Sequence, residues 1–496
     1  MVSKLYAEIP DWAKFLSIIY DNRRYFPLCA LDRLPPIHKV YDFEKIQNGW
    51  DKTLRLIRMG VAPKQIGIYI HWPFCPSHCS FCFCNMALAR SQGEMELELN
   101  VLKREINQFK ETFCGFPMES LYIGGGTPTF MSAEMLDDLL SHIKSSFMFS
   151  PGAEIFTESS PATLDEAKLN ILSRHGFNRI SLGIETFDEQ ILGSQNRQGQ
   201  TRQNAIDVFN MIKKKTPHIT TDIDMIVGLP GQTPDIFLKD MEMALSLRPD
   251  CIHLYFFRNP PRVGLRKGLP ISLADKERRT HLLGLADPIA RQHGYRCDDG
   301  RTFANYSVAN NQEASWRRFE GSILGIGHHA VSHAFGSYWY YHEPIPVSGE
   351  IQSFDLSRFL VYDSDITEEM RSFVVGFFAE YGVVSRVQFK SIFKRDIMDI
   401  GFLKNVIVKM EKLGVIDVRT DMIQWKKAES ILERSLFAKL FYNTKLVRSI
   451  LASEKESFLR FIQDLNQGDA SWQDVAMESF SNSYFRMYYN LKQNKR

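Results

Sequence analysis

Four cysteines fall within residues 69–85, which read Tyr-Ile-His-Trp-Pro-Phe-Cys-Pro-Ser-His-Cys-Ser-Phe-Cys-Phe-Cys-Asn. Their spacing is C-x3-C-x2-C-x-C, from Cys75 through Cys79 and Cys82 to Cys84. Thiolates of this kind are the ligands of iron in iron–sulfur clusters. Three of them on one loop can reach three corners of a [4Fe–4S] cube and leave the fourth iron open. An open iron can bind a small molecule and pass it an electron, so the loop predicts redox chemistry on a bound ligand.

A structural zinc site is the alternative for these cysteines, because zinc also accepts four thiolates. Zinc sites usually draw their ligands from two separated cysteine pairs, and no second pair follows this loop. The spacing therefore favours the cluster. The other cysteines are scattered, which fits a reducing cytosol better than a disulfide framework; they are Cys29, Cys114, Cys251 and Cys297.

A glycine-rich turn, Gly124-Gly125-Gly126-Thr127, comes directly after a short apolar run. Glycines let the backbone approach a ligand closely and present N–H groups without side-chain bulk. No Gly-Lys-Ser/Thr sequence follows, so the turn is not a P-loop. We expect Gly125, Gly126 and Thr127 to contact a bound cofactor.

Polar residues lie at or near the ends of several further apolar runs. Glu158, Glu185 and Asp224 could accept hydrogen bonds from a ribose or an ammonium group, and Arg197 could clamp a carboxylate. Tyr69 precedes the cysteine loop and could cover the cluster or a bound cation. Solvated rim charges are the alternative for the acidic residues.

Three histidines, His328, His329 and His333, follow one another closely in a glycine-containing stretch. They could bind a metal or substrate carboxylates, but no acidic partner is evident beside them. The glycines around them indicate a loop.

From about residue 65 short apolar runs alternate with longer amphipathic stretches. The pattern predicts an α/β fold in which six strand–helix units form a partial (β/α)6 barrel, with chemistry at the carboxyl ends of the strands. The predicted strands are Ile66–Trp72, Leu121–Ile123, Glu154–Glu158, Arg179–Ile184, Thr220–Val227 and Ile252–Phe257. The predicted helices are Glu94–Phe113, Ser132–Ser146, Leu164–His175, Thr201–Lys215 and Thr233–Leu247.

The rest of the chain divides around this core. From Thr367 to about Lys427 three helical patterns precede two short strands, which predicts a mostly helical, winged-helix-like domain. The expected divisions are an N-terminal flap segment (1–64), the barrel core (65–260), a core extension (261–360), the C-terminal domain (361–430) and a helical tail (431–496).

Composition excludes several classes of function. The chain has 496 residues, is 44% hydrophobic and 24% charged, and carries a formal net charge of +2, which indicates an ordinary globular protein without a nucleic-acid surface. No signal-peptide pattern and no run of about 18 apolar residues is evident. We expect a cytoplasmic, monomeric protein that binds neither membrane nor nucleic acid.

Several motifs together resemble one enzyme family. They are Tyr69-Ile-His-Trp-Pro-Phe-Cys, Phe81-Cys-Phe-Cys-Asn85, Ile123-Gly-Gly-Gly-Thr-Pro-Thr129, Ser181-Leu-Gly-Ile-Glu-Thr-Phe187, Asn196-Arg197 and Asp222-Ile-Asp-Met-Ile-Val-Gly-Leu-Pro230. From about residue 65 to 430 the chain is similar to the HemN-like, oxygen-independent coproporphyrinogen III oxidase branch of the radical S-adenosylmethionine (SAM) enzymes.

The resemblance implies a [4Fe–4S] cluster, whose open iron binds SAM and cleaves it to a 5′-deoxyadenosyl radical, and two bound SAM molecules. Cys75, Cys79 and Cys82 would ligate the cluster, and Cys84 would match an extra, non-ligating cysteine of the oxidases. Tyr69 and Glu185 are the catalytic candidates. The SAM contacts would be Tyr69, Gly125, Gly126, Thr127, Glu158, Arg197 and Asp224. We expect a small-molecule substrate and an electron donor such as flavodoxin or ferredoxin.

The chain departs from the family pattern at three places. The family usually has Gln where this chain has Glu185, and Glu-x-Asp/Asn-Pro where residues 158–161 read Glu-Ser-Ser-Pro. The N-terminal Arg-Tyr-Thr-Ser-Tyr-Pro stretch is only hinted at by Arg24-Tyr-Phe-Pro27. We therefore favour methylation or related C–C chemistry on a specialised metabolite with a second SAM. The alternatives are coproporphyrinogen III oxidation or another tetrapyrrole modification, and a heme- or cluster-binding carrier without turnover.

Overall fold

The structure is a computed structural model. It describes residues 39–426, except 83, 85, 198, 258–272, 298–300, 306–320, 329, 343–355, 413 and 415, together with residue 441. Residues 24–27, His329, most of the predicted tail and most of the predicted flap lie outside the described residues, and the proposed domain limits stay predictions.

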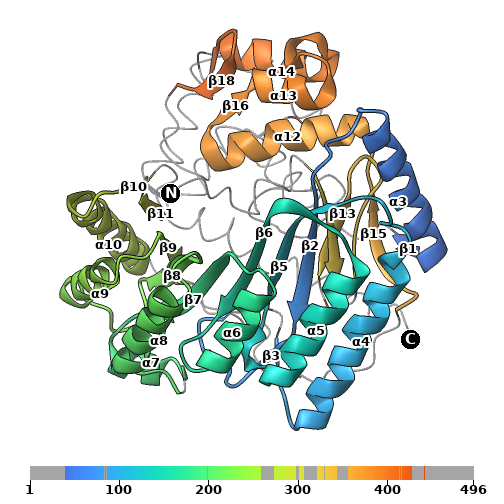
Figure 1. The fold of residues 1–496 in the computed structure, drawn as a ribbon. Coiled ribbons are helices and arrows are strands. Elements are labelled where there is room, and N and C mark those ends of the chain that lie inside the picture. Colours follow the sequence, from blue (N-terminus) through green and yellow to red (C-terminus); the bar gives the residue numbers. More distant parts are fainter. Residues whose placement is uncertain are drawn as a thin grey trace, which may run out of the picture.

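One large sheet organises the molecule (Figure 1). Its strand order is β1-β15-β14-β13-β12-β2-β5-β6-β7-β8-β9-β11-β10. Six neighbouring strands run parallel in sequence order and form the predicted partial barrel. They are β2 (Ile66–Trp72), β5 (Met118–Gly125), β6 (Phe149–Ser159), β7 (Arg179–Glu185), β8 (Thr220–Val227) and β9 (Cys251–Phe256).

Helices cover the outer face of these strands (Figure 1). Ser132 and Asp165 cap two of them by accepting hydrogen bonds from the backbone of Met135 and Lys168, close to where the predicted helices begin. The helices are α4 (Gln92–Lys110), α5 (Ala133–Ser146), α6 (Glu166–Arg174), α7 (Glu189–Ser194), α8 (Arg202–Lys215), α9 (Pro234–Ser246) and α10 (Leu273–Gln292). The short helix α7 is absent from the sequence-based prediction.

Further strands extend the sheet on both sides of the barrel. On one side β12 (Ser322–Ile326) pairs in parallel with β2, and β13 (Val331–Ala334), β14 (Tyr338–Tyr341), β15 (Phe359–Asp363) and β1 (Lys39–Tyr41) continue antiparallel. On the other side β11 (Thr302–Asn305) and β10 (Tyr295–Cys297) follow β9. Helix α3 (Phe43–Arg58) packs on the first extension, where Trp50 Nε1 donates to Tyr340 at 2.6 Å.

The C-terminal module stands apart from the barrel at the top of Figure 1. It contains α12 (Ile366–Tyr381), α13 (Arg386–Phe393) and α14 (Gly401–Lys412). A small sheet of β16 (Val383–Ser385), β18 (Met422–Trp425) and β17 (Ile416–Val418) accompanies them. Three helices with a small antiparallel sheet agree with the predicted winged-helix-like arrangement.

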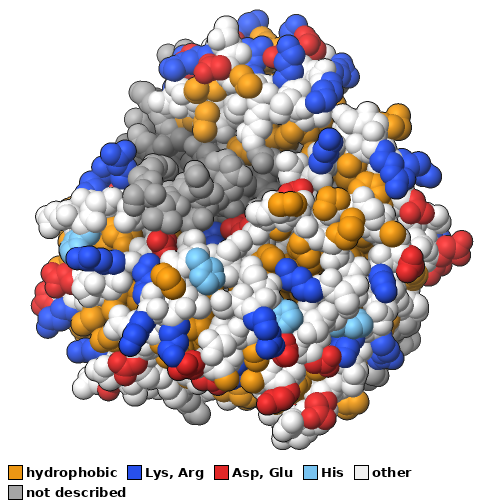
Figure 2. Space-filling model, viewed as in Figure 1, with side chains coloured by type: hydrophobic (Ala, Val, Ile, Leu, Met, Phe, Trp, Pro, Cys, Tyr) orange, Lys and Arg blue, Asp and Glu red, His pale blue; other side chains and the backbone are white. Residues whose placement is uncertain are grey.

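Charged side chains of both signs lie together on the described part of one face. On the described part of the face in Figure 2, basic and acidic side chains are interspersed. Among the described helices, none combines the length and the apolar character that crossing a bilayer would require.

Candidate functional site

The cysteine loop follows β2 and is closed by two short parallel strands, β3 (Phe74–Cys75) and β4 (Ala87–Leu88). Cys75 Sγ lies 3.2 Å from the hydroxyl of Thr127, and Arg197 Nη1 donates to Cys79 Sγ at 3.7 Å. The backbone N–H of Cys84 donates to Cys82 Sγ at 3.4 Å. Cys79 is buried, whereas Cys84 is exposed.

Burial controls the protonation of these thiols. It raises the pKa of Cys75 to about 12, with a smaller opposing effect of the Thr127 hydroxyl, and Cys84 and Cys79 raise it further. Burial likewise raises the pKa of Cys79, against the guanidinium of Arg197. The thiolate is the form that binds iron, so loading a cluster must release protons from this loop.

The glycine turn after β5 lets two loops approach each other. Gly125 has φ +108°, and a Cβ there would lie 2.7 Å from the carbonyl oxygen of Trp72. The N–H of Gly126 donates to the Trp72 oxygen at 2.6 Å, and that of Thr127 donates to the Phe74 oxygen at 2.9 Å. The turn therefore fixes the base of the cysteine loop, and two of its amides are already used in doing so.

A row of aromatic and acidic side chains crosses β2, β5 and β6. The hydroxyl of Tyr69 lies 2.9 Å from Nδ1 of His71, and the Tyr69 ring centroid lies 5.0 Å from that of Tyr122. The Tyr122 hydroxyl donates to Glu158, and burial raises the Tyr122 pKa well above its usual range. Sequence reasoning missed Tyr122, although strand alternation places it on the same face as Gly124.

Arg197 connects the cysteine loop with β7. Its guanidinium donates to the carbonyl of Gly183, lies 3.6 Å from Glu185, and donates to Gln200 at 3.2 Å as well as to Cys79. Glu185 sits at a register shift of β7 with φ +67°. Burial raises the pKa of Glu185, Arg197 opposes that effect, and the carboxylate of Glu158 adds to it.

Asp224 on β8 has one oxygen that is bonded and one that is not. Its Oδ2 accepts from Ser181 at 2.7 Å, whereas its Oδ1 is buried and has no hydrogen-bond partner among the described residues. Burial raises the Asp224 pKa to about 7. A buried oxygen without a partner is expensive to maintain and points to a ligand that donates to it.

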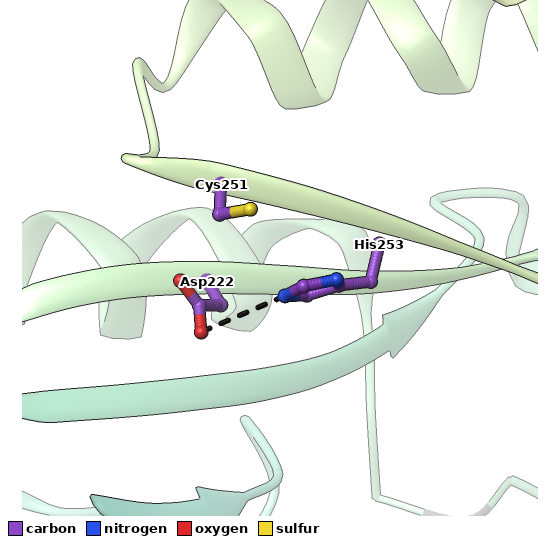
Figure 3. A group of neighbouring side chains, drawn as sticks. All are labelled: Asp222, Cys251 and His253. Carbon is purple, nitrogen blue, oxygen red and sulfur yellow. Dashed lines mark ion pairs between the residues drawn. The ribbon is translucent and has the colours of Figure 1, made fainter. Parts of the chain in front are cut away.

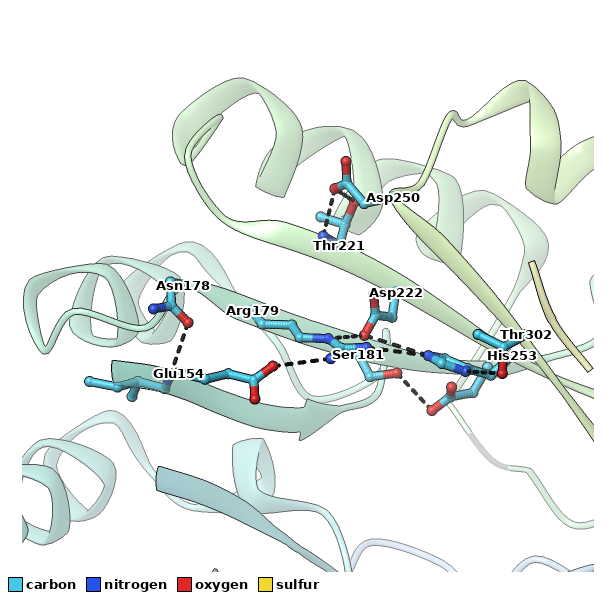
Figure 4. A network of polar contacts seen from close by, with 11 residues as sticks. Glu154, Asn178, Arg179, Ser181, Thr221, Asp222, Asp250, His253 and Thr302 are labelled. Carbon is cyan, nitrogen blue, oxygen red and sulfur yellow. Dashed lines mark hydrogen bonds and ion pairs between the residues drawn. The ribbon is translucent and has the colours of Figure 1, made fainter. Parts of the chain in front are cut away.

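A second polar group lies deeper along β6–β9 (Figure 4). Arg179 Nε lies 2.5 Å from Asp222 Oδ2, and its Nη1 lies 3.1 Å from Glu154. His253 Nε2 lies 3.5 Å from Arg179 Nη2 and 3.7 Å from Asp222 Oδ2. Sequence reasoning singled out none of these residues, although Asp222 begins a motif that it quoted and Arg179 begins a strand that it predicted.

Asp222, His253 and Cys251 together offer three ligand atoms within 4.8 Å of one another (Figure 3). Such a donor set suits zinc. However, Arg179 already contacts both Asp222 and His253 (Figure 4), so a cationic side chain stands where a metal ion would have to bind.

Among the described histidines of this stretch, His328 and His333 do not share a site. His333 on β13 is buried, stacks on Trp339 at 3.8 Å and bonds both oxygens of Glu369 at 3.0 Å. His328 is buried 3.6 Å from Glu98. These two have acidic partners on different helices, Glu369 on α12 and Glu98 on α4, which the sequence could not show, and the contacts join those helices to the extension.

The strand ends thus bring together the three proposed cluster cysteines, one guanidinium and several partly buried carboxylates. The donor set fits a cluster held at Cys75, Cys79 and Cys82. The carboxylates Glu158, Glu185 and Asp224 outnumber the nearby Arg197, so the interior favours a ligand with positive charge.

Comparisons with known proteins agree with this chemistry. Residues 69–244 match the family model of the radical SAM superfamily. The oxygen-independent coproporphyrinogen III oxidase of Escherichia coli is 28% identical over 284 residues, which cover 54% of this chain and 61% of that protein. The oxygen-independent coproporphyrinogen III oxidase of Paracoccus denitrificans is 30% identical over 295 residues, which cover 55% of this chain and 63% of that protein.

The solved structure of coproporphyrinogen III oxidase (HemN) from Escherichia coli shares the fold. Its TM-score is 0.65 at 22% sequence identity, and the match covers 81% of this chain and 95% of that one. The sequence matches span roughly three-fifths of the curated relatives' length.

Proposed function

We propose that this chain, a HemN-like member of the radical SAM superfamily, is an enzyme that uses a [4Fe–4S] cluster and two SAM molecules to modify a small molecule. When bound, the cluster supplies an electron that cleaves SAM and produces a 5′-deoxyadenosyl radical. The observation that carries the proposal is the cysteine loop with its Arg197 contact, set beside buried carboxylates at the strand ends.

Each proposed site residue has a task that its surroundings support. Cys75, Cys79 and Cys82 would hold the cluster as thiolates. Arg197, fixed by the Gly183 carbonyl, would stabilise the Cys79 thiolate and bind a ligand carboxylate.

The residues across the barrel would hold the cationic and ribose parts of SAM. Glu158, oriented by Tyr122, and Asp224, oriented by Ser181, would accept hydrogen bonds from ammonium or hydroxyl groups. Tyr69 would pack beside the reacting centre, and Gly125 would let the loop approach the ligand closely.

For the reaction, we favour methylation or related C–C chemistry on a specialised metabolite, with the second SAM as methyl donor. Glu185 supports this choice, because it places a second buried carboxylate beside Arg197 where oxidase-like sequences carry a neutral amide. A low-potential donor such as flavodoxin or ferredoxin would supply the electron. Site differences, and not the shared fold, decide function within such families.

Coproporphyrinogen III oxidation is the second candidate, and the names of the similar proteins from Escherichia coli and Paracoccus denitrificans favour it. In that reaction SAM would serve only as a radical source. A carrier that binds heme or a cluster without turnover is the third candidate.

Product analysis separates the three. The anaerobically reconstituted protein is incubated with SAM and dithionite, with coproporphyrinogen III or with an extract of the source cells. We expect 5′-deoxyadenosine, and S-adenosylhomocysteine that depends on an extract component. Vinyl-bearing product without S-adenosylhomocysteine would establish the oxidase, and no 5′-deoxyadenosine above a no-protein control would leave the carrier.

A further inference from the structure

The second polar group meets the proposed SAM site through strand register. Asp224 on β8 pairs in register with His253 on β9 and with Gly183 on β7. Asp222, two residues earlier on the same face of β8, pairs with Ser181, whose hydroxyl donates to Asp224. The contacts from His253 to Asp222 and from Ser181 to Asp224 therefore lie on neighbouring strands at adjacent register positions.

Charge balance gives His253 a defined state. Asp222 and Glu154 are two carboxylates that share the single guanidinium of Arg179, and the Asp222 side chain is 0% exposed. One negative charge is left over in a medium where uncompensated charge is unfavourable. A proton on His253 would cancel it.

The surroundings of His253 agree with that state. Burial alone would lower its pKa, but the neighbouring Cys251 and Asp222 raise it well above the ordinary value. Nδ1 lies 3.4 Å from Thr302 Oγ1 on β11, so both ring nitrogens face polar groups. The ring of Tyr255 also lies near His253, with 6.3 Å between the two ring centroids.

The pKa of Asp224 is in turn changed by its neighbours, and His253 lowers it. After burial, which dominates, His253 and the Ser181 hydroxyl lower its pKa, whereas Glu185 on β7 and Glu158 on β6 raise it. His253 is the one cationic group among these influences. Its proton would thus favour the charged form of Asp224.

We propose that His253, held by Asp222, is a positioning residue that keeps Asp224 ionised and leaves its Oδ1 ready to accept a hydrogen bond from bound SAM. The inference rests on the proposed function for the identity of the ligand. The link between His253 and Asp224 itself stands on the register of β8 and β9, which pairs the two residues.

The test uses the full-length protein and needs no turnover. The free energy of unfolding is measured by urea denaturation from pH 5 to 9 for the wild type, Asp224→Asn, His253→Gln and the double variant. The part of the pH dependence of the unfolding free energy that disappears in Asp224→Asn reports the titration of Asp224. We expect its midpoint to rise by about one pH unit in the His253→Gln background. Cys251→Ser alters the same cluster but leaves the cation in place, so it is the matched control and should shift the midpoint by less than His253→Gln does.

The second readout is the affinity of the reconstituted protein for SAM, measured by equilibrium dialysis over the same pH range. SAM affinity should fall on acidification as Asp224 becomes protonated. In His253→Gln we expect that fall to begin at a higher pH, in step with the Asp224 midpoint. An unmoved midpoint in His253→Gln, or a loss of SAM affinity that is equal at every pH, would overturn the proposal. So would one equivalent of zinc in the wild type that His253→Gln and Cys251→Ser both lose. If the wild type binds no SAM, the proposed function fails, and the Asp224 titration still decides whether His253 controls that carboxylate.

Discussion

Carboxylates in two regions of the molecule differ in how fully they are hydrogen-bonded. Where helices α12 and α4 meet the extension, Glu369 on α12 accepts from His333 with both oxygens, and from the Gly336 backbone and the Ser364 hydroxyl. Glu105 accepts from His342 at 2.8 Å with one oxygen and from the Gly327 N–H at 2.8 Å with the other.

In the barrel, Asp224 keeps one buried oxygen without a partner among the described residues. Unmade hydrogen bonds destabilise a fold, so selection for stability alone would not leave this oxygen bare. The difference teaches that Glu369 and Glu105 hold helices α12 and α4 to the extension, whereas we propose that Asp224 is kept for a bound ligand. Substitutions on the two sides should therefore affect different measurements.

The largest effect belongs to the cysteines. Replacing Cys75, Cys79 or Cys82 singly by Ala should abolish the cluster absorption near 400 nm (roughly where iron–thiolate bands fall) and all SAM cleavage, because three thiolates are needed to leave one iron open. Cys84→Ala is the matched control in the same loop and should keep both. A Cys84→Ala protein without iron, beside a Cys82→Ala protein with it, would reassign the third ligand.

The next largest effect is expected at Glu369, which joins α12 to the extension. Glu369→Gln should lower the free energy of unfolding by about 3 kcal/mol, because it breaks a buried pair and leaves the donors around it poorly matched. Chemical denaturation measures this loss. SAM affinity of the folded fraction should stay unchanged. A specific loss of SAM binding would show that Glu369 does more than stabilise the fold.

Asp224→Asn should show the opposite profile. SAM affinity should fall about tenfold, roughly the worth of one hydrogen bond to a charged group, while stability at pH 8 is kept or improved. Ser181→Ala, which removes the neighbouring hydroxyl and leaves the carboxylate, is the control and should weaken SAM binding less. Equilibrium dialysis and urea denaturation give the two numbers.

The pH dependence of stability sharpens the same contrast. The Asp224 pKa is raised from 3.8 to about 7, so between these values the folded chain binds more protons than the unfolded chain. The contribution of this group to stability is therefore fully present at acid pH and falls as the pH rises from about 4 to about 7. Asp224→Asn should flatten that part of the curve, and an unchanged slope would show that Asp224 ionises normally.

The smallest effect concerns Glu185. Glu185→Gln keeps the shape and removes one charge beside Arg197, so the KM for SAM should change by roughly two- to fivefold, as expected for a partly offset ion pair. The assay is initial-rate formation of 5′-deoxyadenosine, with the conservative Glu185→Asp as a comparison. Identical kinetics in all three proteins would remove Glu185 from the site.

The sequence by itself determined the six barrel strands, most of the helices that cover them and the cysteine loop. These depend on local properties: apolar runs of strand length, capping residues such as Ser132 and Asp165, and thiols spaced along a single loop. The predicted strands Ile66–Trp72 and Thr220–Val227 match the structure residue for residue.

Only the tertiary structure decided which polar groups have partners. His333 and Glu369, 36 residues apart, and His342 and Glu105, 237 residues apart, could not be paired from sequence because nothing local links them. The same holds for Tyr122 with Glu158 and for Arg179 with Asp222, which meet because parallel strands bring residues of different units to one face. Burial and charge at a site are sums over neighbours from many elements, so Asp224 could be named from the sequence, but its unpaired oxygen could not.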